Sequence, residues 1–151
     1  MIFFNYIKIF NLLLLMNLYS LKFTNPNITL KIKGTGLKNI FGKQTGQSFQ
    51  KKYYPNKIYI NGNKQDIIAH SYKFNLTENI VELYWNSTIA NCTNMFRSST
   101  DMTEINLFYF DASQVQTTWC MFFYCISLTS VNLSNFVTKK CIPYDRDVSR
   151  L

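Results

Sequence analysis

The residues that could carry acid–base, nucleophilic or metal chemistry are few and scattered. The 151-residue chain has one histidine, His70, eight Asp plus Glu, and four cysteines. Catalytic and zinc sites need such groups in closely spaced sets, and no such set, Gly-rich phosphate loop or nucleophile motif occurs here. The sequence therefore predicts no catalytic residues, no metal ligands and no cofactor, and we expect that the protein is not an enzyme.

The strongest pattern in the chain is a repeat with a period of 26 residues. Met95-Phe96 returns as Met121-Phe122 in the same register as four further identities, which pair Thr103, Asn106, Leu107 and Phe110 with Thr129, Asn132, Leu133 and Phe136. A fixed period of this size indicates one supersecondary unit stacked on its own copy. Such units form recognition surfaces more often than active sites.

The apolar spacing within each copy predicts the shape of the unit. Met102-x-x-Ile105-x-Leu107-x-x-Phe110 is the spacing of a leucine-rich repeat, in which the central residues form a short strand. Alternation predicts that Ile105, Leu107, Val131 and Leu133 point inward. The predicted fold is mainly β. It is a short leucine-rich-repeat solenoid over residues 79–138, with a parallel strand ladder, irregular or short helical return arms and a degenerate first copy from Val81.

The outward positions of this ladder are the candidate ligand face: Glu104, Asn106, Ser130 and Asn132. They alternate with the inward apolar residues and would stand side by side on adjacent strands. The alternative is that these side chains are only solvated.

Residues 121–136, MFFYCISLTSVNLSNF, resemble the 26-residue repeat of BspA-like surface proteins. In that family Met-Phe-x-x-Cys is followed by Leu-x-x-Leu-x-Leu-Ser-x-Phe, and Cys125 and Ser134 take the matching places here. The preceding copy departs from the pattern, with Ser99 in place of the cysteine. The resemblance covers about residues 80–138 and implies a secreted or surface-displayed protein for adhesion, with no catalytic residues.

The region before the repeats divides into a leader and a β-rich segment. Residues 1–21 have one Lys, a short apolar run and a small residue at Ser20, which predicts a signal peptide or, alternatively, an uncleaved signal-anchor. Residues 22–78 are predicted to form a small antiparallel β region that caps the repeats. Ile28–Lys33 alternates apolar and polar residues, and Asn61-Gly62 after Lys57–Ile60 predicts a hairpin.

Charge is distributed unevenly along the chain. Residues 22–65 hold nine Lys and no acid, whereas residues 66–138 hold six acids against Lys73 and Arg97. A basic N-terminal region predicts binding to an anionic polysaccharide, and the alternative is a solvated basic face. We expect no nucleic-acid partner, because that would not fit a secretory leader.

An oxidising compartment would permit disulfides and glycans. Cys125 is expected in the core, and a disulfide between Cys92 and Cys120 is left open because the two lie on adjacent arms. Five Asn-x-Ser/Thr sequons predict candidate glycosylation at Asn27, Asn75, Asn86 and Asn91, whereas Asn132 lies within the strand ladder.

The C-terminal residues 139–151 leave the repeat pattern and are expected to be a divergent, disordered tail. The last repeat would then be uncapped, which predicts self-association through it or a truncated or frame-shifted relative of a longer repeat protein. The sequence as a whole predicts a secreted or cell-surface protein that binds a protein or glycan ligand on a neighbouring or host cell. The alternative is a structural surface-coat protein, or a truncated paralogue without a specific ligand.

Overall fold

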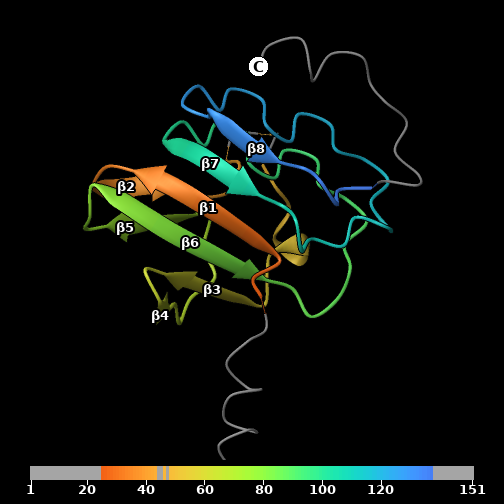
Figure 1. Cartoon of the computed structure of the whole chain (residues 1–151), viewed down its shortest axis with the longest axis horizontal. Coiled ribbons are helices and arrows are strands. Elements are labelled where there is room, and N and C mark those ends of the chain that lie inside the picture. Colours follow the sequence, from red (N-terminus) through yellow and green to blue (C-terminus); the bar gives the residue numbers. More distant parts are fainter. Residues whose placement is uncertain (1–24, 44–45, 47, 138–151) are drawn as a thin grey trace, which may run out of the picture.

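A computed structural model describes residues 25–43, 46 and 48–137, so the predicted leader and the divergent tail lie outside the described residues. The main element is a six-stranded mixed sheet with the order β4-β3-β6-β1-β7-β8 (Figure 1). The chain order of the elements is β1 Ile28–Lys33, β2 Gly36–Asn39, the 3-10 helix η1 Lys51–Tyr53, β3 Lys57–Ile60, β4 Asn63–Lys64, β5 Ser71–Phe74, β6 Glu78–Tyr84, β7 Met102–Asn106 and β8 Ser130–Asn132.

Local sequence accounts for the antiparallel half of this sheet. β1 has the predicted bounds, and its apolar residues Ile28, Leu30 and Ile32 are all buried. The predicted hairpin is also present, because β3 pairs with β4 across Asn61 and Gly62, whose φ angles of 51° and 78° suit a tight turn. Within residues 22–78 the antiparallel pairs are β2–β5 and β3–β4, whereas β1 pairs with β6 and β7.

The inner side of the sheet is covered by loops and by a second, two-stranded sheet of β2 and β5. The segment after β2 carries Phe41 and Phe49 into the core. Phe41 lies 6.2 Å from Phe96 and 4.7 Å from Tyr54, measured between ring centroids. This loop therefore joins the N-terminal region to the repeat region through aromatic packing.

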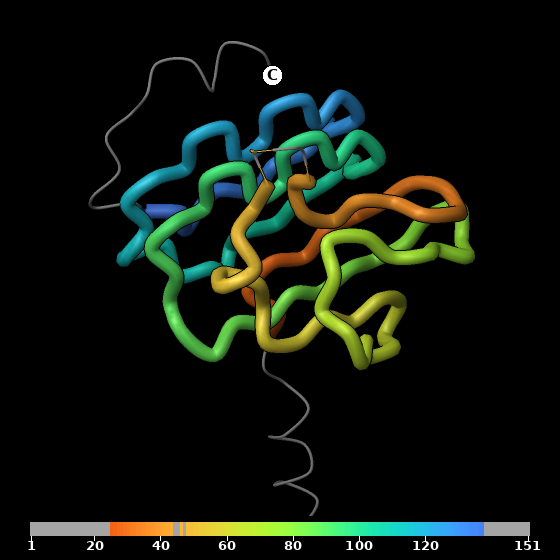
Figure 2. Tube along the Cα trace, turned by 180° about the vertical axis from the view of Figure 1, so that it is seen from behind, coloured from red at the N-terminus to blue at the C-terminus, as the bar shows by residue number. Residues whose placement is uncertain are grey.

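The two repeat copies lie side by side over their whole length. β7 pairs in parallel with β8, and Ile105 faces Val131 at the 26-residue offset. The arms before each strand are also joined, since the backbone N–H of Cys92, Asn94 and Phe96 donates to the carbonyls of Thr117, Trp119 and Met121. Figure 2 shows these arms as neighbouring windings on the side of the molecule behind the sheet.

The predicted leucine-rich-repeat solenoid is nevertheless wrong. A solenoid needs each coil to stack on the one before, but β6, the predicted first coil, is not adjacent to β7. β1 lies between them and pairs antiparallel with both, with Leu30 opposite Val81 on one side and Ile105 on the other. The physical reason is that β1 alternates apolar residues in the same way as its neighbours, so it fits between two strands that bury one face. Only β7 and β8 are parallel among the described strands.

The described residues contain no helix long and apolar enough to span a membrane.

A groove on the exposed sheet face

The four residues of the predicted ligand face come together in one groove. Glu104 and Asn106 of β7 and Ser130 and Asn132 of β8 all line it, and its volume is about 330 Å³. Thr29, Leu30 and Lys31 of β1, Ile105 of β7 and Ile80 of β6 complete its lining. The groove lies on the side of the sheet opposite the core, which we call the exposed sheet face.

Strand register explains this gathering. Side chains two residues apart point to the same face, so Thr29 and Lys31 stand outward while Leu30 is buried. Thr29 is opposite Asn106, which in turn faces Asn132, and Lys31 is opposite Glu104, which faces Ser130. Two cross-strand rows therefore form the floor of the groove.

The two asparagines have fixed side chains. Oδ1 of Asn106 accepts the backbone N–H of Phe108 at 2.9 Å, and Oδ1 of Asn132 accepts the N–H of Ser134 at 3.1 Å. Such Asx turns orient the amide, which leaves Nδ2 pointing away from the turn. Neither Nδ2 donates to another residue in the described part of the chain, so each of these two lining residues keeps a donor available for a ligand.

A charge pair forms the other wall. Nζ of Lys31 donates to a carboxylate oxygen of Glu104 at 2.7 Å, and both side chains remain partly exposed. The hydrogen bond and the negative charge of Glu104 raise the pKa of Lys31. Because the two charges compensate each other, the groove offers polar groups without a large net charge.

The sequence did not indicate that Thr29, Lys31 and Ile80 belong to this site. Thr29 and Lys31 precede their β7 partners Asn106 and Glu104 by 77 and 73 positions, and Ile80 lies 22 positions before β7 begins. No motif links these three residues to β7. Lys31 and Glu104 become partners only when β1 is inserted beside β7, and a register shift after Lys31 decides which residues face each other. Charge patterning alone could not identify that pair.

The predicted basic N-terminal region does not form one continuous surface on this face. Lys31 is paired with Glu104 on this face. Lys38 lies on β2 of the second sheet, where it donates to Asp101 at 3.0 Å. Lys33 stands opposite Glu78 in the register of β1 and β6. Positive and negative side chains therefore alternate over the exposed sheet face.

The candidate glycosylation residues differ in their surroundings. Asn75 and Asn86 are exposed, and Asn86 borders a second depression of about 220 Å³ beside Trp85 and Asp111. Asn27 is engaged, because its Oδ1 accepts the N–H of Trp85 at 2.6 Å. Asn91 is held in an Asx turn with Thr93, as Asn132 is with Ser134. Asn75 and Asn86 thus leave the most room for a glycan.

The three described cysteines are buried. No disulfide joins Cys92 to Cys120, and Cys125 lies in the core as predicted, where its Sγ donates to the carbonyl of Phe96 at 3.0 Å. Burial raises the pKa of the Cys125 thiol to about 11. Within the described residues, His, Cys, Asp and Glu form no cluster that could hold a metal ion.

We expect Cys125 to resist alkylation in the folded protein. A thiol with a pKa of about 11 instead of 9.0 holds far less thiolate, so at pH 8 its reaction with iodoacetamide should be slower by roughly a hundredfold or more. Since the fold favours the neutral thiol, the free energy of unfolding should fall as pH rises from 9.0 towards about 11. Mass spectrometry of labelled peptides, with the same chain in urea as control, measures the rate. Equal labelling in both conditions would contradict the prediction.

Comparison with family models, with curated protein sequences and with solved structures gives no match for this chain.

Proposed function

We propose that the protein is a non-catalytic recognition module whose ligand site is the groove on the exposed sheet face. The observation that carries the proposal is that the residues expected to face outward from both repeat copies line a single groove. Residues 1–21 would direct the chain to the secretory pathway, so that recognition takes place outside the cell or at its surface.

The chemistry of the groove favours a neutral glycan as the ligand. Two oriented amide donors, the hydroxyls of Thr29 and Ser130, and a compensated Lys–Glu pair suit a ligand with many hydroxyl groups. Tight protein interfaces usually depend on buried aromatic or Arg anchors, and none of the described residues that line this groove is aromatic or Arg. A protein ligand is therefore less well supported than a glycan.

The same residues explain why we propose binding rather than catalysis. Glu104 is the single carboxylate of the groove, and it is held by Lys31 at 2.7 Å. Hydrolysis of a glycoside normally uses two carboxyl groups, one as acid and one as base or nucleophile. The resemblance of residues 121–136 to BspA-like repeats, with its implied role in adhesion, is consistent with this proposal and stays a prediction.

A glycan array followed by calorimetric titration of the best neutral oligosaccharide tests the proposed function. The double substitution Asn106→Ala and Asn132→Ala removes both free donors, and with about 1 kcal/mol for each hydrogen bond we expect the affinity to fall roughly thirtyfold. Binding to this neutral ligand should change little between low and high salt.

The matched control is Asn75→Ala, which removes an exposed asparagine away from the groove and should leave affinity unchanged. Absence of saturable binding by the wild-type chain would favour a structural surface-coat protein instead. If the chain binds only an acidic polysaccharide and its affinity falls steeply at high salt, the binding site would instead be the basic N-terminal region.

A further inference from the structure

The two repeat copies differ sharply in how their equivalent residues are covered. In the first copy Phe96, Met102, Ile105, Leu107 and Phe110 are at most 4% exposed. Their counterparts in the second copy form a surface that we call the open end: Phe122, Leu128, Val131, Leu133 and Phe136. None of these five is fully buried, and Leu133 is 45% exposed where Leu107 is 0%.

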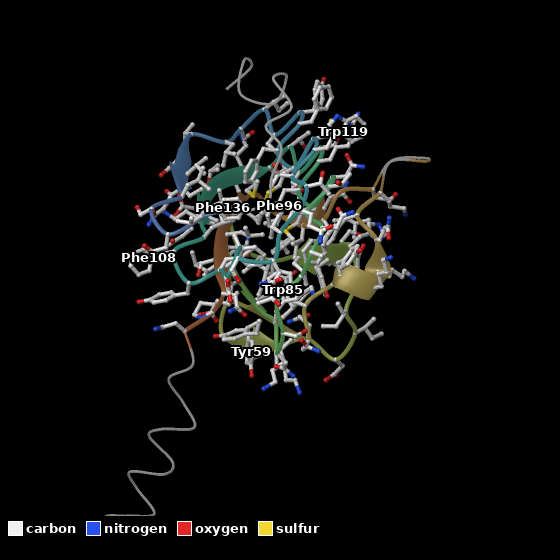
Figure 3. All side chains as sticks on the ribbon, turned by 90° about the vertical axis from the view of Figure 1, so that its right-hand side faces the viewer. Tyr59, Trp85, Phe96, Phe108, Trp119 and Phe136 are labelled. Atoms are coloured by element: carbon white, nitrogen blue, oxygen red, sulfur yellow. The ribbon has the colours of Figure 1, made fainter. Side chains whose placement is uncertain are left out.

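Two aromatic stacks stop at this surface. Phe41, Phe96 and Phe122 follow one another, and the last two rings are 5.9 Å apart with an angle of 9° between their planes. Phe110 and Phe136 stack in the same way at 6.0 Å and 13°. Figure 3 labels Phe96 of the first copy and Phe136 of the second, and it shows Phe108 at the edge of the molecule. Each stack has a further ring position beyond Phe122 or Phe136 that no described residue fills.

The outer edge of β8, at the open end, has no partner strand among the described residues. β8 is the last strand of the sheet as described, with β7 on one side and no described strand on the other. An exposed edge strand beside an apolar surface is a template for pairing with another chain. Ile126 and Val137 of the second copy are also apolar and are 69% and 64% exposed.

Charge indicates what kind of partner this surface fits. Residues 115–137 contain no Asp, Glu, Lys, Arg or His, although the whole chain carries a net charge of +8. A second copy can therefore approach by this surface without like-charge repulsion across the contact, and an apolar patch is complementary to itself. A charged peptide, glycan or membrane headgroup would find no counter-charge there.

We propose that the open end is a homodimer interface, in which two copies of the chain pack their open ends together about a two-fold axis with β8 of each copy at the contact. The second copy covers Phe122, Leu133 and Phe136 in the way that the second repeat covers Phe96, Leu107 and Phe110. This inference does not depend on the proposed ligand, because it rests on the apolar end and not on the groove.

Sedimentation velocity of the purified full chain over a range of concentrations tests the proposal. We expect the wild-type chain to be a dimer and Leu133→Lys to raise the dimer dissociation constant at least a hundredfold, because it places a charge from each copy at the apolar contact. Leu133→Ala, which keeps the surface neutral, should raise the constant by a smaller factor. Leu37→Lys, at a 75% exposed leucine on β2, is the matched control and should leave the dimer intact.

Circular dichroism of each variant shows whether the fold is retained, which is expected because Leu133 is exposed in the single chain. A wild-type chain that stays monomeric overturns the proposal. A dimer that Leu37→Lys dissociates and Leu133→Lys leaves intact would also overturn the proposal, because the interface would then lie at β2.

Discussion

Substitution of Phe96 by Ala is expected to lower the free energy of unfolding by about 3 to 5 kcal/mol, the usual cost of truncating a buried aromatic ring. Phe96 is 0% exposed, and its ring lies between Phe41 of the N-terminal region and Phe122 of the second repeat copy. Removal of the ring therefore leaves a cavity where three parts of the chain meet. Urea unfolding monitored by circular dichroism measures the change.

Phe108→Ala is the matched control, because it removes the same ring from a side chain that is 38% exposed and contacts Tyr109 at the periphery. Its cost should stay below about 1 kcal/mol, as for most surface substitutions. If Phe96→Ala and Phe108→Ala lower the free energy of unfolding equally within error, the packing of Phe96 between Phe41 and Phe122 would be contradicted.

Substitution of Gly42 by Ala is expected to lower the free energy of unfolding by about 3 kcal/mol, at the upper end of the range for overpacking. A Cβ atom at this position would lie 2.1 Å from the backbone oxygen of Asn94 and 3.0 Å from Cβ of Arg97. The nearest obstacle is backbone, which cannot rotate away as a side chain can. The contact between this loop and the first repeat arm, in which Gly42 N–H donates to the carbonyl of Met95 at 2.9 Å, would have to shift.

Lys43→Ala is the control for Gly42→Ala, because it changes the next residue, whose side chain is exposed. Thermal unfolding of the two variants should differ by many degrees, with Lys43→Ala within about 0.5 kcal/mol of the wild type. A tolerated Gly42→Ala would mean that the loop after β2 does not lie against the first repeat arm.

The sequence predicted individual strands and turns well, but it did not predict which strands lie beside each other. β1 and the β3–β4 hairpin were predictable because alternation of apolar residues and an Asn-Gly turn are short-range signals. The 26-residue offset between β7 and β8 was also predictable, because identical residues at identical spacing pack against each other in register. The solenoid was not correct, since the pattern within a strand does not tell which strand lies beside it.

The candidate site shows the same division. The outward direction of Asn106 and Asn132 follows from alternation, and the structure places both in the groove. The Lys31–Glu104 pair and the part played by Thr29 and Ile80 depend on the insertion of β1 between β6 and β7. The insertion of β1 joins strands that are far apart in the sequence. It is stabilised by burial of the apolar faces of β6, β1 and β7, which no local sequence pattern reports.

Sequence by itself determined the β content, the strand and turn positions, the repeat register and the outward face of each repeat, because these depend on the period of apolar residues along the chain. Only the tertiary structure decided that the sheet is mixed, that β1 completes the groove, and that one repeat copy is buried while its equivalent is exposed. The reason is that burial depends on what lies beyond each residue in space: Leu107 has the second copy against it, and Leu133 has no described residue in the equivalent place.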